Sequence, residues 1–182
     1  MVQYALILAL MTALITGCQR EATPHHSLYN GKALHLNNGT IEVRHSDRWS
    51  VNEDIRALGG PILLNNFSSR YLPGGIIPPG GAEIVILRKP LDAQSQKDAV
   101  KSDAEDSKFV REEFINIEEN KILLRTYDEE YTDDLVMQRS IGYVPLNDSH
   151  LRFSISYHKG DEMSEKLLSE FKAILSSTAV TK

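Results

Sequence analysis

The sequence predicts an α+β fold in which a mostly antiparallel sheet packs against a C-terminal amphipathic helix. Two neighbouring segments near the C-terminus carry this prediction. Residues 151–157 alternate apolar and polar side chains, the two-residue period of a strand with one buried face. Residues 163–175 place apolar side chains three and four positions apart, the period of a helix with one apolar face. Several shorter strand patterns precede them, so a sheet covered by a helix is expected.

The upstream strands are predicted from alternation or from short apolar runs bounded by turn residues. Two of them form a hairpin with a four-residue connection at 118–121. His150 and His158, at the ends of the last strand, are expected to face solvent. In chain order, the predicted strands are 41–44, 49–51, 62–64, 83–87, 114–117, 122–127, 135–144 and 151–157.

Helices are predicted in one place and left open in another. Asp161 is the expected N-cap of the C-terminal helix, because its carboxylate can accept a hydrogen bond from a free N–H of the first turn. Residues 92–107 fit either a second helix with a thin apolar face or a charged loop.

Length and composition indicate one globular domain. The chain has 182 residues, of which 41% are hydrophobic and 25% charged. We expect the domain to span 41–182 and the polar residues before it to form a flexible tether. The formal net charge of −5 disfavours a nucleic-acid partner. The single cysteine excludes an intramolecular disulfide and any multi-cysteine metal site, and no cofactor is predicted.

An apolar run of twelve residues, 4–15, precedes the cysteine. As a helix it would rise about 18 Å, well short of a hydrocarbon core of about 30 Å. This length suits an export signal better than a membrane-spanning helix. The alternative is a short hydrophobic helix with a chance cysteine behind it.

The run leads into a motif that resembles the lipobox of bacterial lipoproteins: Ile15, Thr16, Gly17 and Cys18. The resemblance implies that a signal peptidase recognises the first three residues and removes residues 1–17. It also implies that Cys18 carries diacylglycerol on its sulfur and usually an acyl chain such as palmitate on its amine. The implied partner is therefore a membrane, and residues 18–40 are the lipidated N-terminus and tether. Gln19 resembles the class sorted to the periplasmic face of the outer membrane rather than retained at the inner membrane.

The order of the predicted elements over 41–178 resembles the PsbP-like α/β/α sandwich, a fold of envelope lipoproteins and photosystem extrinsic proteins. The resemblance implies a sheet between helical layers. It rests on element order, and a fold does not determine a function.

The sequence contains no motif that predicts catalysis. G-x-S-x-G, H-E-x-x-H, G-x-x-x-x-G-K-[ST] and G-x-G-x-x-G patterns are all absent, so an enzyme is not expected. The acidic stretch 128–134 concentrates five carboxylates, but it lacks the residue order of an EF-hand loop. A solvated turn between two strands is expected there, and no metal site is predicted.

The loop 71–81 is rich in proline and glycine, which prevents regular strand pairing. Its apolar side chains either fold back over the core as a plug or form an exposed contact patch. The residues that this pattern nominates for contact with a partner are Leu72, Ile76 and Ile77.

Together, these patterns predict a lipid-anchored cell-envelope protein whose domain is a non-catalytic interaction or binding module facing the periplasm. The partner would be an envelope protein or polymer. The alternative is a carrier of a small molecule or metal with a pocket between the sheet and the helix.

Overall fold

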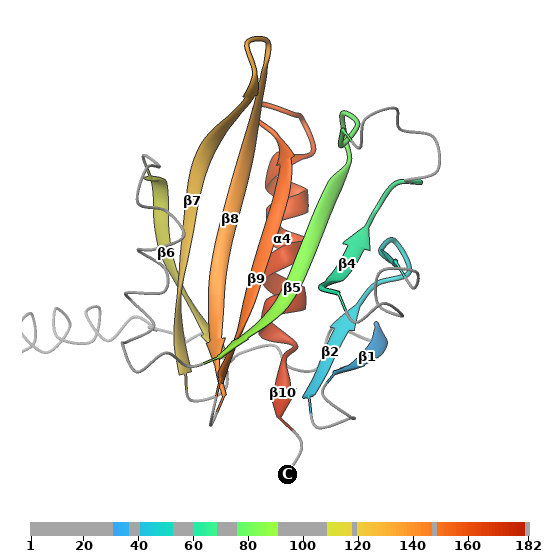
Figure 1. The fold of residues 1–182 in the computed structure, drawn as a ribbon, viewed down its shortest axis with the longest axis vertical. Helices are drawn as coiled ribbons and strands as arrows, with labels where there is room; N and C mark the ends of the chain where they lie inside the picture. The colour runs from blue at the N-terminus through green and yellow to red at the C-terminus, as the bar shows by residue number, and fades with distance from the viewer. Residues whose placement is uncertain are drawn as a thin grey trace, which may run out of the picture.

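A computed structural model describes residues 31–36, 41–52, 60–68, 76–90, 109–117, 120–146 and 149–180. In this part of the chain, a large sheet and a small sheet pack with one long helix (Figure 1). The helix, α4 (Ser164–Ser176), lies behind the large sheet in the view of Figure 1. The predicted α+β class is therefore confirmed.

The large sheet has seven strands in the order β3-β4-β5-β9-β8-β7-β6. Each neighbouring pair is antiparallel, as the alternation of apolar and polar residues predicted. The strands are β3 (Ser50–Val51), β4 (Ile62–Asn65), β5 (Ala82–Pro90), β6 (Phe109–Ile117), β7 (Asn120–Thr132), β8 (Leu135–Pro145) and β9 (Ser149–His158).

The small sheet has the order β1-β2-β10 and comprises β1 (Lys32–Leu36), β2 (Ile41–His45) and β10 (Ala179–Val180). Strand β1 lies in the range assigned to the tether, so the folded domain begins before Ile41. The reason is that Leu34 and Leu36 lie on one face of the strand and are buried when β1 pairs with β2.

The main core lies between α4 and the sheet. One face of α4 buries five apolar side chains, and the odd-numbered side chains of β9 meet them. The buried residues of the two elements are Leu167, Leu168, Phe171, Ile174, Leu175, Leu151, Phe153, Ile155 and Tyr157. The amphipathic pattern and the alternating pattern therefore describe the two sides of one interface.

The start of α4 differs from the prediction. The N-cap is Met163, and Asp161 lies two residues before it. The carboxylate of Asp161 accepts a hydrogen bond from the backbone N–H of Met163 (2.7 Å) and another from the N–H of Gly80. Asp161 thus stabilises the turn that precedes the helix and ties it to the loop before β5.

Two predicted connections are shorter than expected because the strands pair further than their apolar patterns reach. Ile117 pairs with Asn120, so residues 118–119 connect β6 to β7. Strand β7 continues to Thr132, so most of the acidic stretch lies in a strand and the turn consists of Asp133 and Asp134. Ion pairs hold two of its carboxylates on the sheet: Asp128 with Lys159 (2.6 Å) and Glu129 with Arg139 (2.9 Å).

The prediction for the two histidines of β9 was wrong. His150 is 7% exposed, and its ring meets the ring of Tyr143 edge-on with centroids 5.0 Å apart. His158 is half-buried, and its Nε2–H donates to the carbonyl of Ile77 (2.5 Å). Both lie against other parts of the fold, which the period of the strand alone does not show.

Some predictions concern residues outside the described ranges. These are the signal peptide 1–17, the lipobox with Cys18, most of the tether, Leu72 and the segment 92–107. Among the helices that the structure describes, none combines the length and the apolar character needed to cross a membrane.

Candidate binding pocket on the front face of the sheet

The face of the large sheet opposite α4, which is turned toward the viewer in Figure 1, is here called the front face. The strand register brings polar residues from three strands into one row across it. Glu83 of β5 is opposite Ser156 of β9, and Ser156 is opposite Arg139 of β8. Directly opposed residues on one face have Cβ atoms about 5 Å apart, so these side chains are immediate neighbours.

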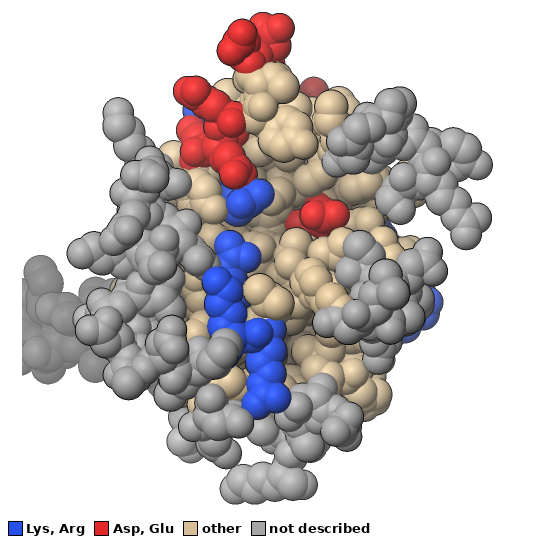
Figure 2. Space-filling model, viewed as in Figure 1, with Lys and Arg blue, Asp and Glu red and all other residues tan. Residues whose placement is uncertain are grey.

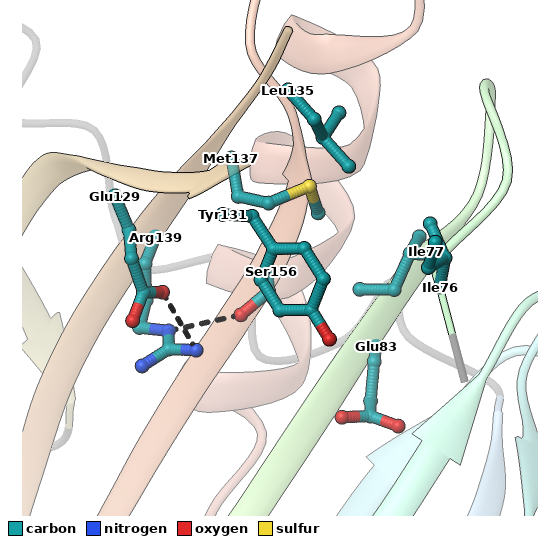
Figure 3. A pocket seen from close by; sticks show the side chains of 9 residues that line it. All are labelled: Ile76, Ile77, Glu83, Glu129, Tyr131, Leu135, Met137, Arg139 and Ser156. Atoms are coloured by element: carbon teal, nitrogen blue, oxygen red, sulfur yellow. Dashed lines mark hydrogen bonds and ion pairs between the residues drawn. The ribbon is translucent and has the colours of Figure 1, made fainter. Parts of the chain in front are cut away.

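All three residues of this row line a pocket of about 160 Å³ on the front face (Figure 3). Four strands and the loop before β5 contribute to its wall. The lining residues are Ile76, Ile77, Glu83, Glu129, Tyr131, Leu135, Met137, Arg139 and Ser156. The pocket is therefore assembled from segments that are far apart in the sequence.

Arg139 lies on one side of the pocket, and its guanidinium group binds two other residues of the pocket wall. Its Nε–H donates to the hydroxyl oxygen of Ser156 (3.0 Å), and its Nη2 forms an ion pair with Glu129 (2.9 Å). Figure 3 shows both interactions converging on the guanidinium group. The charges of Arg139 and Glu129 thus compensate each other within the wall.

Glu83 lies on the other side of the pocket. Its side chain is half-buried, and burial raises the pKa of its carboxyl above the usual value, although the positive charge of Arg139 acts in the opposite direction. Within the described part of the chain, no hydrogen bond or ion pair of this carboxylate is found. Among the described residues, this carboxylate therefore lacks both full hydration and a partner in direct contact.

The remaining wall is apolar and reaches the molecular surface. Ile76 is 39% exposed and Tyr131 is 56% exposed, whereas Met137 is buried. In Figure 3 the ring of Tyr131 extends toward Glu83 and the two isoleucines. The pocket therefore combines a carboxylate that no described residue binds with an apolar rim that a ligand can reach from outside.

Two contacts hold the loop that carries Ile76 and Ile77. His158 on β9 donates a hydrogen bond to the Ile77 carbonyl, and Asp161 accepts one from the Gly80 N–H. Hydrogen bonds from the backbone N–H of Met163 and then of Gly80, together with the nearby His158, lower the pKa of Asp161. The pocket wall is thus connected to the beginning of α4.

We expect Asp161→Ala to lower the melting temperature at neutral pH. The lost turn hydrogen bonds correspond to about 1 kcal/mol, or about 2–4 °C for a chain of this size. Because the pKa of Asp161 is lowered in the folded state, its stabilisation is present above the ordinary pKa of 3.8 and is lost as the pH falls below it. The melting temperatures of the wild type and Asp161→Ala should therefore converge as the pH is lowered from 7 to 3.

The exposed neighbour Glu162 provides the control, since Glu162→Ala should leave the melting temperature unchanged. Equal losses of melting temperature in the two variants would contradict the role of Asp161.

Charge is distributed unevenly over the front face. Figure 2 shows lysine and arginine side chains in a strip down its middle, with acidic side chains gathered above. The register assigns Arg125, Arg139 and Arg152 to this face. The pocket lies where the acidic end meets the basic strip, because both Glu129 and Arg139 line it.

The structure brings together two of the three residues that the sequence nominated for partner contact. Ile76 and Ile77 both line the pocket, the first exposed and the second half-buried, so the loop contributes to a surface as well as to packing. Contact with a partner remains a prediction. The carrier alternative placed a pocket between the sheet and α4, but the described side chains pack there as a core and the pocket lies on the opposite face.

Sequence reasoning missed most of the polar wall. Glu83 begins a run assigned to a buried strand, Arg139 and Ser156 lie inside other strands, and Tyr131 belonged to a predicted turn. A polar residue at the start of an apolar run was the available signal for Glu83. As for metal ions, no group of three or more candidate ligands occurs in the described ranges.

Comparisons with known proteins identify similar folds at low sequence identity. No protein-family model matches the sequence, and no curated protein matches it. The Ran-binding protein Mog1p of Saccharomyces cerevisiae has a TM-score of 0.56 and 12% identity over 85% of this chain and 97% of the yeast chain. A protein of Bacteroides thetaiotaomicron has a TM-score of 0.50 and 12% identity, with 84% of this chain and 49% of that chain covered. A cyanobacterial PsbP from Synechocystis is also similar, with a TM-score of 0.46 and 10% identity over 82% of this chain and 91% of the other. At these identities the likeness concerns the fold alone.

Proposed function

We propose that this chain is a lipid-anchored protein of the cell envelope whose folded domain is a non-catalytic binding module. In this proposal, acyl chains on Cys18 hold the protein at a membrane, on the periplasmic face of the outer membrane, and the domain binds an envelope protein. The contact surface is the rim of the front-face pocket, formed by Ile76, Ile77 and Tyr131.

One observation supports this surface above all. Two of the large apolar side chains that the fold leaves exposed, Ile76 and Tyr131, line the same pocket although they come from different parts of the chain. Scattered exposed apolar residues are ordinary, but apolar side chains gathered around a concave site are typical of binding surfaces. A partner that covers them would remove apolar area from water.

The fold is compatible with such a role. The yeast protein of similar fold is a Ran-binding protein, and therefore binds another protein. The lining residue with a nucleophilic hydroxyl, Ser156, is opposite Glu83, but its oxygen accepts a hydrogen bond from Arg139 and is not paired with a base among the described lining residues. Binding without catalysis is the function that this arrangement supports best.

Site-directed crosslinking in the intact native envelope tests the contact surface. A photoreactive amino acid at position 76 or 131 should form a defined covalent adduct with a partner protein. The same group at Ser169, an exposed position on α4, should not form this adduct. Absence of an adduct at both rim positions, or an identical adduct from Ser169, would contradict the proposal.

We expect Ile76→Ser to weaken partner binding without loss of stability. Its side chain is already 39% exposed, and surface substitutions usually change the free energy of unfolding by less than about 0.5 kcal/mol. The adduct formed from position 131 should therefore decrease while the melting temperature stays within about 2 °C of the wild type. A large loss of melting temperature would assign Ile76 to the core as a plug.

A further inference from the structure

We propose that the front-face pocket binds the side chain of a lysine from the partner protein, with the carboxylate of Glu83 as the counter-ion and the apolar wall around its alkyl stem. This inference rests on the proposed function and names the chemistry that the binding surface recognises.

The charge of the pocket favours a cation. Its lining residues include two carboxylates, Glu83 and Glu129, and one guanidinium, Arg139, which leaves one negative charge in excess. Glu129 and Ser156 already bind the Arg139 guanidinium at 2.9 and 3.0 Å. Among the described lining residues, the charge without a bound counter-ion is therefore that of Glu83.

The burial of Glu83 favours a ligand that carries the missing partner. A carboxylate that is partly removed from water and has no donor destabilises the folded state. The raised pKa of Glu83 reflects this loss of hydration. An ammonium group in the pocket would restore a charge-assisted hydrogen bond, so the cost of burying Glu83 would be offset only in the complex.

The volume of the pocket and its small number of oxygen ligands favour a lysine side chain over other cations. Pockets for drug-sized molecules occupy about 300–1,000 Å³, so a pocket of about 160 Å³ suits one side chain. Divalent cations such as calcium require about six to eight oxygen ligands, whereas one carboxylate is free here. The ammonium of lysine is a compact point charge on a flexible apolar stem, while a guanidinium carries five donors in a planar fork. Ile77, Leu135 and Met137 can contact such a stem, and Tyr131 offers a further acceptor oxygen.

A methyl NMR titration of the full chain in detergent micelles tests the assignment. Methyl groups of Ile76, Ile77 and Met137 report directly on the pocket. The probe is Nα-acetyl-lysine N-methylamide, a lysine with a capped backbone and a free side-chain ammonium group. Its matched control is Nα-acetyl-norleucine N-methylamide, which keeps the stem and lacks the ammonium group. We expect the lysine probe to shift these resonances in the millimolar range and the norleucine probe to bind on the order of tenfold more weakly or worse. Equal binding of the two probes would overturn the proposal.

The variant Glu83→Gln removes the negative charge of the carboxylate and keeps the size of the side chain. It should weaken the lysine probe on the order of tenfold and leave the norleucine probe unchanged. Glu165→Gln removes one charge from α4 on the other side of the sheet, where the side chain is 87% exposed, and should have no effect. Unchanged lysine binding in Glu83→Gln would reject Glu83 as the counter-ion. If that variant failed to fold, the comparison of the two probes on the wild type would still decide the question.

Melting curves of the same variant without ligand give an independent readout. Because the pKa of Glu83 is raised in the folded state, the ionised carboxylate destabilises the folded protein at neutral pH. This destabilisation disappears as the pH falls through the folded-state pKa toward the ordinary value of 4.5. Arg139 is the charged group that attenuates it. Glu83→Gln should therefore melt higher than the wild type at pH 7, with the difference vanishing at low pH. A lower melting temperature at pH 7 would show that Glu83 has a stabilising partner and would overturn the inference.

A third probe distinguishes a protein lysine from a free amine. Butylamine presents the same ammonium and stem without a peptide backbone, so it should bind more weakly than the capped lysine. Equal or tighter binding of butylamine would assign the pocket to a small free amine and contradict the commitment to a protein partner. Failure of all lysine tests with persistence of an adduct at position 76 or 131 would reject this inference alone, whereas absence of an adduct at both rim positions would reject the proposed function.

Discussion

Replacement of Phe171 by alanine should cause the largest loss of stability expected for a single substitution in this protein. Phe171 is 0% exposed and lies in the centre of the apolar face of α4. Removing a buried phenylalanine ring costs about 3–5 kcal/mol, because apolar contacts are lost and a cavity remains. For a chain of this length, this corresponds to a fall in melting temperature of about 6–20 °C.

Thermal unfolding followed by the fluorescence of the buried Trp49 measures this effect. Ser169→Ala, two residues away on the exposed side of α4, is the matched control and should change the melting temperature by less than about 2 °C. A small effect of Phe171→Ala would mean that α4 does not pack on the sheet through this face.

Substitution of Cys18 by serine should have an all-or-none effect on location. If the lipobox resemblance holds, the wild type carries at least two acyl chains at this residue. Each buried methylene contributes about 0.8 kcal/mol, and two chains anchor a protein stably whereas one chain does so marginally. Without the sulfur, no diacylglycerol can be attached, so the variant should lose its lipid anchor.

Labelling with radioactive palmitate, together with fractionation of membranes by density, measures the loss. The wild type should be labelled and recovered with outer membranes, whereas Cys18→Ser should be unlabelled. Thr16→Ala keeps a small residue before the cysteine and should behave as the wild type. Mass spectrometry that finds an unmodified thiol at Cys18 in a chain retaining residues 1–17 would contradict the anchoring proposal.

The fold could be predicted from the sequence to the extent that it depends on local periodicity. The alternation of 151–157 predicted a strand with one buried face, and the spacing of apolar residues in 163–175 predicted the helix that covers it. Boundaries were less accurate, because hydrogen bonding extends strands beyond their apolar cores. The continuation of β7 to Thr132 and the pairing of β1 with β2 are examples.

The pocket could be predicted only in part, for a related reason. Ile76 and Ile77 were conspicuous as apolar residues in a loop of prolines and glycines, and both line it. Glu83 and Arg139 were not conspicuous, since each is an ordinary polar residue within a strand. Their relation depends on Ser156, which is opposite both of them in the sheet.

By itself, the sequence determined the α+β class, the apolar faces that form the core and the motif that predicts a lipid anchor, because each depends on residues that are close together in the chain. The tertiary structure alone decided which charges are compensated. Strand register joined Arg139 to Glu129 and Ser156 and left the half-buried carboxylate of Glu83 without a hydrogen bond or ion pair to any described residue. Such pairing depends on distances of a few ångströms between residues on different strands, 17 positions apart for Arg139 and Ser156 and 73 for Glu83 and Ser156, and no local pattern of the chain encodes them.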